Sequence, residues 1–167
     1  MAIGLGLALA TANLAAALST PLKVPFFHDH TDQCGPSTLA EMLSYCGIPA
    51  NPAELRQEMY VSKLHGTLPM DLFLTAQNHG LKAQMVHGDA ALLQSELNAG
   101  RPVLILLNLG YEILPVDHFI VITGFDTERQ GFYAHSGEKA NQFFPMKKLA
   151  REWGKADNWA LAAAQCP

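Results

Sequence analysis

The chain has 167 residues, of which 49% are apolar and 16% are charged, and its formal net charge is −4. This length and composition are typical of one globular domain with a hydrophobic core, and they exclude a disordered chain. No run of Lys or Arg stands out, so nothing in the charge pattern supports a nucleic-acid partner.

The first twenty residues differ from the rest of the chain. Residues 1–18 carry no charged side chain, and the alanines at 15–17 are the small residues expected before a signal-peptide cleavage site, although the positive n-region is missing. We therefore divide the chain into a signal-like apolar segment, 1–20, and a folded domain, 21–167, and expect export. The alternative is an Ala/Leu-rich helix that packs on a partner or associates with a membrane.

Helical signals dominate the first part of the domain. Apolar residues recur at helical spacing after Pro36 and stop at Gly47, and Asn51 is a suitable N-cap for the next helix. The expected helices cover about 35–46, 52–60, 67–80, 89–100 and 145–153.

Strand signals dominate the second part. The run 102–109 is continuously apolar, as in a buried central strand, and 118–125 is rich in β-branched and aromatic residues. A turn around 126–131 predicts a hairpin with the strand that follows. The expected strands cover about 81–86, 102–109, 118–125, 131–137 and 158–164. Helices followed by strands indicate an α+β domain.

The three cysteines are Cys34, Cys46 and Cys166. In an exported protein an odd count leaves at least one thiol outside a disulfide. A bond between Cys46 and Cys166 would leave Cys34 as that thiol. The sequence does not fix the distance between the two, so this pairing is a hypothesis.

Cys34 lies directly before the helix that begins at Gly35 and Pro36. A thiol in this position lies close to the positive end of the helix dipole and to unpaired backbone N–H groups, which lowers the thiol pKa and favours the nucleophilic thiolate. The same N–H groups can stabilise an oxyanion, and Gly35 leaves room for a peptide backbone. The alternative is a structural cysteine buried at a helix start.

His118 begins the strongly apolar strand HFIVITGF. A histidine at the rim of such a strand is held rigidly with its tip facing a cleft, which suits a general base. The alternative is an edge histidine with a structural partner. A cysteine at a helix start followed far downstream by a histidine on a strand is the arrangement of a papain-like site.

Two segments resemble a known family. The stretch Val24–Ile48, with its V-P lead-in and C-G-P at a helix start, and the stretch DHFIVITGFD (Asp117–Asp126) are similar to motifs of the bacteriocin-leader-processing (double-glycine) cysteine peptidases. The tail is most similar to stand-alone papain-like relatives of bacterial envelopes.

This resemblance implies a papain-like α+β fold with N-terminal helices packed on an antiparallel sheet. It also implies peptide-bond hydrolysis by Cys34 and His118 without a cofactor, a peptide or protein substrate, and a periplasmic or cell-envelope location in a bacterium.

The chain departs from the family before the cysteine. The family carries a Gln five or six residues upstream of the Cys, where this sequence has Asp29 and His28. His28 can donate an N–H to an oxyanion, whereas an Asp29 carboxylate would repel one. Gln33, next to the cysteine, is not expected to substitute for the family's amide.

The second departure concerns the partner of the histidine. The family orients its His with an Asp on the next strand, and the matching stretch 134–138 contains no Asp. A turn centred on 128–129 would place His118 opposite about Lys139, but a slip of one residue exchanges the faces. Ser136, Glu138 and Asn141 therefore remain alternatives for orienting the imidazole.

Other readings follow from these departures. A peptide-binding module without catalysis is the main alternative, and a transglutaminase-like acyltransferase with the same pair is a second. The triplet His28–His30 has no second ligand cluster at a recognisable spacing, so no metal site is expected. Asp117 precedes His118 on a strand and is expected to point the opposite way into solvent.

Overall fold

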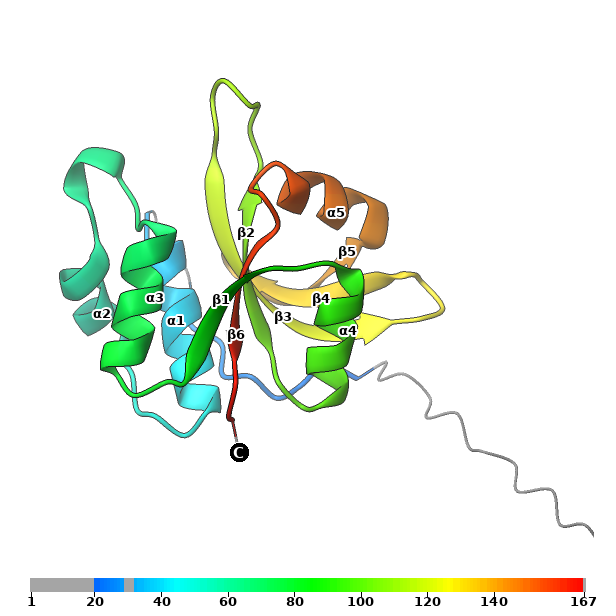
Figure 1. Ribbon diagram of the computed structural model, residues 1–167, viewed down its shortest axis with the longest axis horizontal. Helices are drawn as coiled ribbons and strands as arrows, with labels where there is room; N and C mark the ends of the chain where they lie inside the picture. The colour runs from blue at the N-terminus through cyan, green and yellow to red at the C-terminus, as the bar shows by residue number, and fades with distance from the viewer. Residues whose placement is uncertain (1–19, 29–31, 167) are drawn as a thin grey trace, which may run out of the picture.

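The computed structural model describes residues 20–28 and 32–166 (Figure 1). Its helices are α1 (Cys34–Tyr45), α2 (Pro52–Met59), the short 3₁₀ helix η1 (Ser62–Leu64), α3 (Pro69–Asn78), α4 (Ala90–Asn98) and α5 (Met146–Gly154). Its strands are β1 (Ala83–His87), β2 (Val103–Asn108), β3 (Asp117–Asp126), β4 (Gly131–Ser136), β5 (Lys139–Pro145) and β6 (Trp159–Ala163). Every α-helix and strand except β5 falls on a segment predicted for it.

Local signals explain why these helices begin and end where predicted. The Asn51 side chain accepts a hydrogen bond from the backbone N–H of Ala53 (2.9 Å), and Asp89 accepts one from that of Leu92 (2.8 Å). Gly47 follows α1 with a φ of +76°, a conformation that glycine adopts without steric cost. Each signal acts within a few residues, so the sequence alone reveals it.

The strands form one sheet in the order β1-β6-β2-β3-β4-β5, in which every neighbouring pair is antiparallel. Helices α1, α2 and α3 pack on one face, where Leu104 and Phe119 are among the buried residues. Helices α4 and α5 pack on the other face, against Ile105 and Ile120. Successive residues of a strand point to opposite faces of the sheet. Because helices cover both faces, β2 is buried along its whole length. The predicted α+β fold is confirmed, with the addition that the two later helices cover the second face.

The segment before α1, described over 20–28 and called the lead-in here, is bound to the sheet. The backbone N–H of Leu22 donates to the carbonyl of Thr123 in β3 (2.8 Å). Pro21 packs so closely on Gly124 that a Cβ there would lie 2.9 Å from the Pro21 Cα. The lead-in therefore crosses β3 before the chain enters α1.

A disulfide joins Cys46 at the end of α1 to Cys166 beyond β6, the pairing that the sequence left as a hypothesis. It links the helix that carries Cys34 to the C-terminal part of the chain. The signal-like segment lies outside the described residues, apart from Thr20. In the portion of the chain that is described, we find no helix with the length and hydropathy needed to cross a membrane.

Candidate active site

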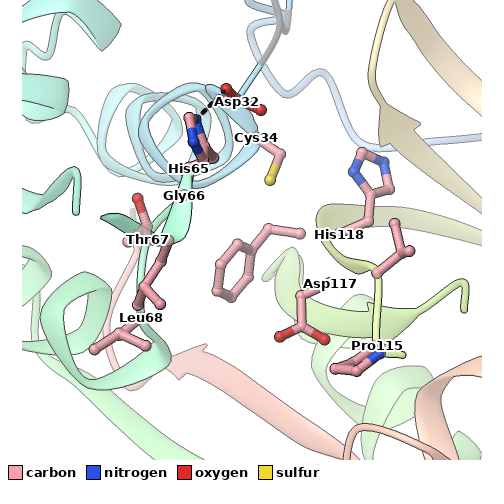
Figure 2. A pocket seen from close by; sticks show the side chains of 12 residues that line it. Asp32, Cys34, His65, Gly66, Thr67, Leu68, Pro115, Asp117 and His118 are labelled. Atoms are coloured by element: carbon pink, nitrogen blue, oxygen red, sulfur yellow. Dashed lines mark ion pairs between the residues drawn. The ribbon is translucent and has the colours of Figure 1, made fainter. Parts of the chain in front are cut away.

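A cleft of about 590 Å³ opens where the N-terminal end of α1, the loop at 64–68 and the start of β3 meet (Figure 2). It is lined by Asp32, Cys34, Leu64, His65, Gly66, Thr67, Leu68, Pro115, Val116, Asp117, His118 and Phe119. Cys34 and His118, which are far apart in sequence, thus face one hollow. Figure 2 shows the Cys34 sulfur entering the cleft from α1 and the His118 imidazole entering it from β3.

Cys34 is the first residue of α1, and its side chain is half-buried at the edge of the core. The Thr38 hydroxyl donates to the Cys34 carbonyl (2.6 Å), which anchors the first turn. Gly35 lies so close to the loop that a Cβ there would be 2.8 Å from the Thr67 side chain. This close approach brings the second wall of the cleft against the cysteine. Backbone N–H groups in the first turn of a helix lack intrahelical acceptors, so they suit an anionic oxygen near the sulfur.

His118 is held by Ser136. Its Nε2 atom lies 2.9 Å from the Ser136 Oγ at the end of β4. Burial lowers the pKa of His118 below its ordinary value of 6.5, which favours the neutral form of the ring. A neutral imidazole with one nitrogen fixed by a hydroxyl keeps the other nitrogen for a second partner.

The structure corrects the predicted position of Lys139 opposite His118. The β3–β4 register shifts between Ile122 and Gly124, and the register ends with Val121 opposite His135. Lys139 instead pairs with Ser136 at the start of β5. The bulge and the early end of β4 are tertiary features that turn position alone does not reveal.

The other two alternatives for orienting the imidazole lie elsewhere. Glu138 is exposed in the turn before β5. The Asn141 amide oxygen accepts a hydrogen bond from the Thr123 hydroxyl (2.8 Å). Of the three residues left open by the sequence, the described contacts therefore join only Ser136 to His118.

His28 lies outside the cleft lining of the described residues. Its side chain is exposed, its ring packs edge-on against Phe26 at a centroid distance of 5.0 Å, and its carbonyl accepts from the Ser37 hydroxyl (3.4 Å). Gln33 is the N-cap residue of α1 and makes no side-chain capping bond. Asp29 and His30, and with them most of the triplet considered for metal, lie outside the described residues. Within 20–28 and 32–166, no cluster of three or more His, Cys, Asp or Glu has the proximity needed to hold a metal ion.

Asp117 was predicted to point away from His118 into solvent, and the residue is exposed. In Figure 2 its carboxylate and the His118 imidazole extend in different directions from the start of β3, although both residues border the same cleft. Partial burial raises the pKa of Asp117 above its ordinary value.

The opposite wall was not anticipated from the sequence. It consists of the loop from Leu64 to Leu68, and His65 on this loop lies 3.6 Å from Asp32 in an ion pair drawn in Figure 2. This contact connects the loop to the residues just before Cys34. His65 belongs to no motif, and nothing in the stretch Val24–Ile48 singles out Asp32, so no local signal marks this contact.

Comparison with known proteins places this geometry in context. The family described as "Peptidase_C39 like family" matches residues 21–161. A candidate C39-like peptidase from Bacillus anthracis superposes with a TM-score of 0.73 at 20% identity, over 86% of this chain and 96% of that one. No curated protein was found to match the sequence.

Two other solved structures are similar in fold. The double glycine motif protease from an AMS/PCAT transporter, in complex with the leader peptide, has a TM-score of 0.65 at 21% identity, over 89% of this chain and 97% of that one. The peptidase domain of Streptococcus ComA, a bifunctional ABC transporter of a quorum-sensing pathway, has a TM-score of 0.68 at 18% identity, over 84% and 98%.

Proposed function

The chain belongs to the Peptidase_C39-like family, and we propose that it is a cysteine peptidase with Cys34 as nucleophile and His118 as general base. One observation carries the proposal. The two side chains line the same cleft, and the imidazole is held in place by Ser136. A nucleophile next to a base that a third group orients is the arrangement required for covalent acyl transfer.

The chemistry follows from the state of the ring. Because burial lowers the pKa of His118, the imidazole is neutral and can accept the Cys34 thiol proton while Sγ attacks the substrate carbonyl carbon. We assign the Nε2–H as donor to the Ser136 hydroxyl, which leaves Nδ1 as the nitrogen that accepts the thiol proton. The imidazolium then protonates the leaving amine as the C–N bond breaks. Water hydrolyses the thioester, giving its proton to the imidazole and returning the thiol.

The oxyanion is assigned to the backbone of α1. N–H groups at a helix start are fixed donors and need no reorganisation when charge develops on the carbonyl oxygen. His28 would have to turn away from Phe26 and toward the sulfur to contribute. We therefore give His28 a secondary role, in which it supplements the backbone donors when substrate is bound.

The substrate we propose is a peptide or a protein segment. The related double glycine motif protease is described in complex with a leader peptide, which supports a peptide in the corresponding cleft. Apolar side chains on both walls, including Leu64, Leu68 and Val116, also favour a partly apolar chain.

We also propose export from a bacterial cytoplasm to the periplasm or envelope. The disulfide between Cys46 and Cys166 supports this, because such bonds persist mainly in oxidising compartments. Residues 1–18 supply the apolar segment of a signal. N-terminal sequencing of the protein recovered from the periplasm tests the proposal, and an intact N-terminus on protein retained in the cytoplasm would contradict it.

A peptide-binding module without turnover is the second candidate. It is favoured by the absence of an Asp from 134–138, the stretch that matches the one where the resembled peptidases carry it, and by the loss of their upstream Gln. A hydroxyl stabilises an imidazolium less than a carboxylate does, so this site is expected to be slower than one with Asp.

Turnover of a peptide library separates these functions. We expect the wild-type protein to cleave a subset of peptides, and Cys34→Ala and His118→Ala to reduce cleavage to background. His87→Ala, at an exposed histidine outside the cleft, is the matched control and should retain full activity. Products are also checked for transfer to an added primary amine, which would indicate an acyltransferase. Absence of cleavage by wild type, with peptide binding retained in Cys34→Ala, would contradict the peptidase proposal and favour the binding module.

A further inference from the structure

A buried ionisable pair lies next to the candidate site and has no part in the chemistry above. Glu41 in α1 and His135 in β4 have exposed fractions of 1% and 2%, and the Glu41 Oε2 lies 3.2 Å from the His135 Nδ1. Removing such groups from water carries a large desolvation cost, and an apolar pair of similar volume is often at least as stable. A buried pair of this kind therefore calls for an explanation other than stability.

Three segments that carry the site converge on the Glu41 carboxylate. Glu41 shares α1 with Cys34, and its Oε1 accepts a hydrogen bond from the backbone N–H of Phe27 in the lead-in (3.0 Å). Its other oxygen contacts His135 in β4, whose ring packs edge-on against Phe26 at a centroid distance of 5.1 Å. One carboxylate thus joins the helix of the nucleophile to the lead-in and to β4.

His135 directly precedes Ser136, the residue that holds the imidazole of His118. The sheet alone leaves this end of β4 weakly fixed. Its register with β3 ends at His135, and its register with β5 shifts between Ala134 and Ser136. A contact from His135 to α1 supplies the restraint that the strand pairing lacks at this point.

We infer that the Glu41–His135 pair is a positioning pair, which fixes Ser136, and through it the imidazole of His118, relative to the sulfur of Cys34. The inference rests on the proposed pairing of Cys34 with His118. Neither Glu41 nor His135 is among the residues that line the cleft. Their part is to hold α1 and the end of β4 at the spacing that the proton transfer needs.

The test compares the full chain with Glu41→Ala and Glu41→Gln. Alkylation of Cys34 by iodoacetamide is followed from acid to alkaline pH, with the Cys46–Cys166 disulfide intact so that one thiol reacts. Thermal unfolding, kcat and KM are measured alongside. Glu96→Ala, which breaks the partly buried Arg101–Glu96 ion pair (2.7 Å) outside the cleft, is the control for a purely structural loss.

Glu41→Ala is expected to slow Cys34 alkylation at neutral pH and to lower kcat by about tenfold to a hundredfold, because small displacements of reacting groups have effects of this size. KM should change little. The pH profile of alkylation should move toward that of His118→Ala. Glu41→Gln keeps an acceptor for the Phe27 N–H and a polar contact to His135, so it should rescue both rates to within about threefold of wild type.

An unchanged alkylation profile in Glu41→Ala, together with a loss of thermal stability like that of Glu96→Ala, would overturn the inference and leave the pair a structural role. If Glu41→Ala does not fold, the apolar double variant Glu41→Met with His135→Leu is read by the same criteria. If wild type cleaves no peptide while the alkylation profile shifts as expected, the proposed function fails and the positioning role is upheld.

Discussion

Replacing Ser136 by alanine removes the hydroxyl whose Oγ lies 2.9 Å from the His118 Nε2. The net contribution of such a neutral hydrogen bond is about 1 kcal/mol, which corresponds to about fivefold in rate if the bond is maintained through the transition state. We therefore expect Ser136→Ala to lower kcat/KM about fivefold. The fold should persist, because Ser136 is only half-buried at the end of β4.

The opposite change gives the same reasoning a sharper test. Ser136→Asp places a carboxylate beside Nε2. A charge-assisted bond contributes about 1.5–3 kcal/mol, which is roughly 1 kcal/mol more than the neutral bond, so kcat should rise about fivefold over wild type. The carboxylate also raises the pKa of His118, which moves the acidic limb of the kcat/KM profile to higher pH.

The assay is kcat/KM on one cleaved peptide measured across pH, with Ser95→Ala as control because Ser95 is exposed in α4. Unchanged kcat/KM and pH profile in both Ser136 variants would refute the assignment of Ser136 as the residue that orients the imidazole.

Three other outcomes are expected. Because burial lowers the pKa of His118 below 6.5, the unfolded chain binds this proton more tightly, and the free energy of unfolding should fall as pH drops below about 6.5. In urea unfolding, His118→Gln should lack this part of the pH dependence. An identical pH dependence in wild type and variant would contradict the prediction. Gly35→Ala places a Cβ 2.8 Å from the Thr67 side chain, so it should lower the free energy of unfolding by about 1–3 kcal/mol and disturb the cleft wall. An unchanged urea midpoint would show that the contact between Gly35 and Thr67 is not tight. Replacing Cys46 and Cys166 by serine removes a disulfide between residues with a sequence separation of 120. It should lower the free energy of unfolding by about 2–4 kcal/mol, measured by calorimetry, while kcat/KM stays within about twofold. Lost activity at full stability would contradict this prediction.

Features that depend on a few neighbouring residues could be predicted from the sequence. The caps at Asn51 and Asp89 are of this kind, because the side chain and the backbone groups that it satisfies are close in the chain. Strand β5 was missed because most of its residues are exposed and only Phe144 is buried, so no alternating pattern marks it.

Features that depend on distant segments required the structure. The partner of His118 was left open among three residues, since a bulge in β3 and the early end of β4 decide which side chain reaches the ring. Glu41 gave no sign of its role, because its partners belong to the lead-in and to β4.

Mass spectrometry of an acid-quenched reaction tests most directly whether Cys34 forms the covalent intermediate. A cleaved peptide is mixed with wild-type protein, quenched within one turnover, and digested to locate any added mass. A thioester adduct on Cys34 in the wild type, absent from Cys34→Ala together with cleavage, is the expected result. Cleavage that continues in Cys34→Ala, or an adduct on another residue, would contradict the account.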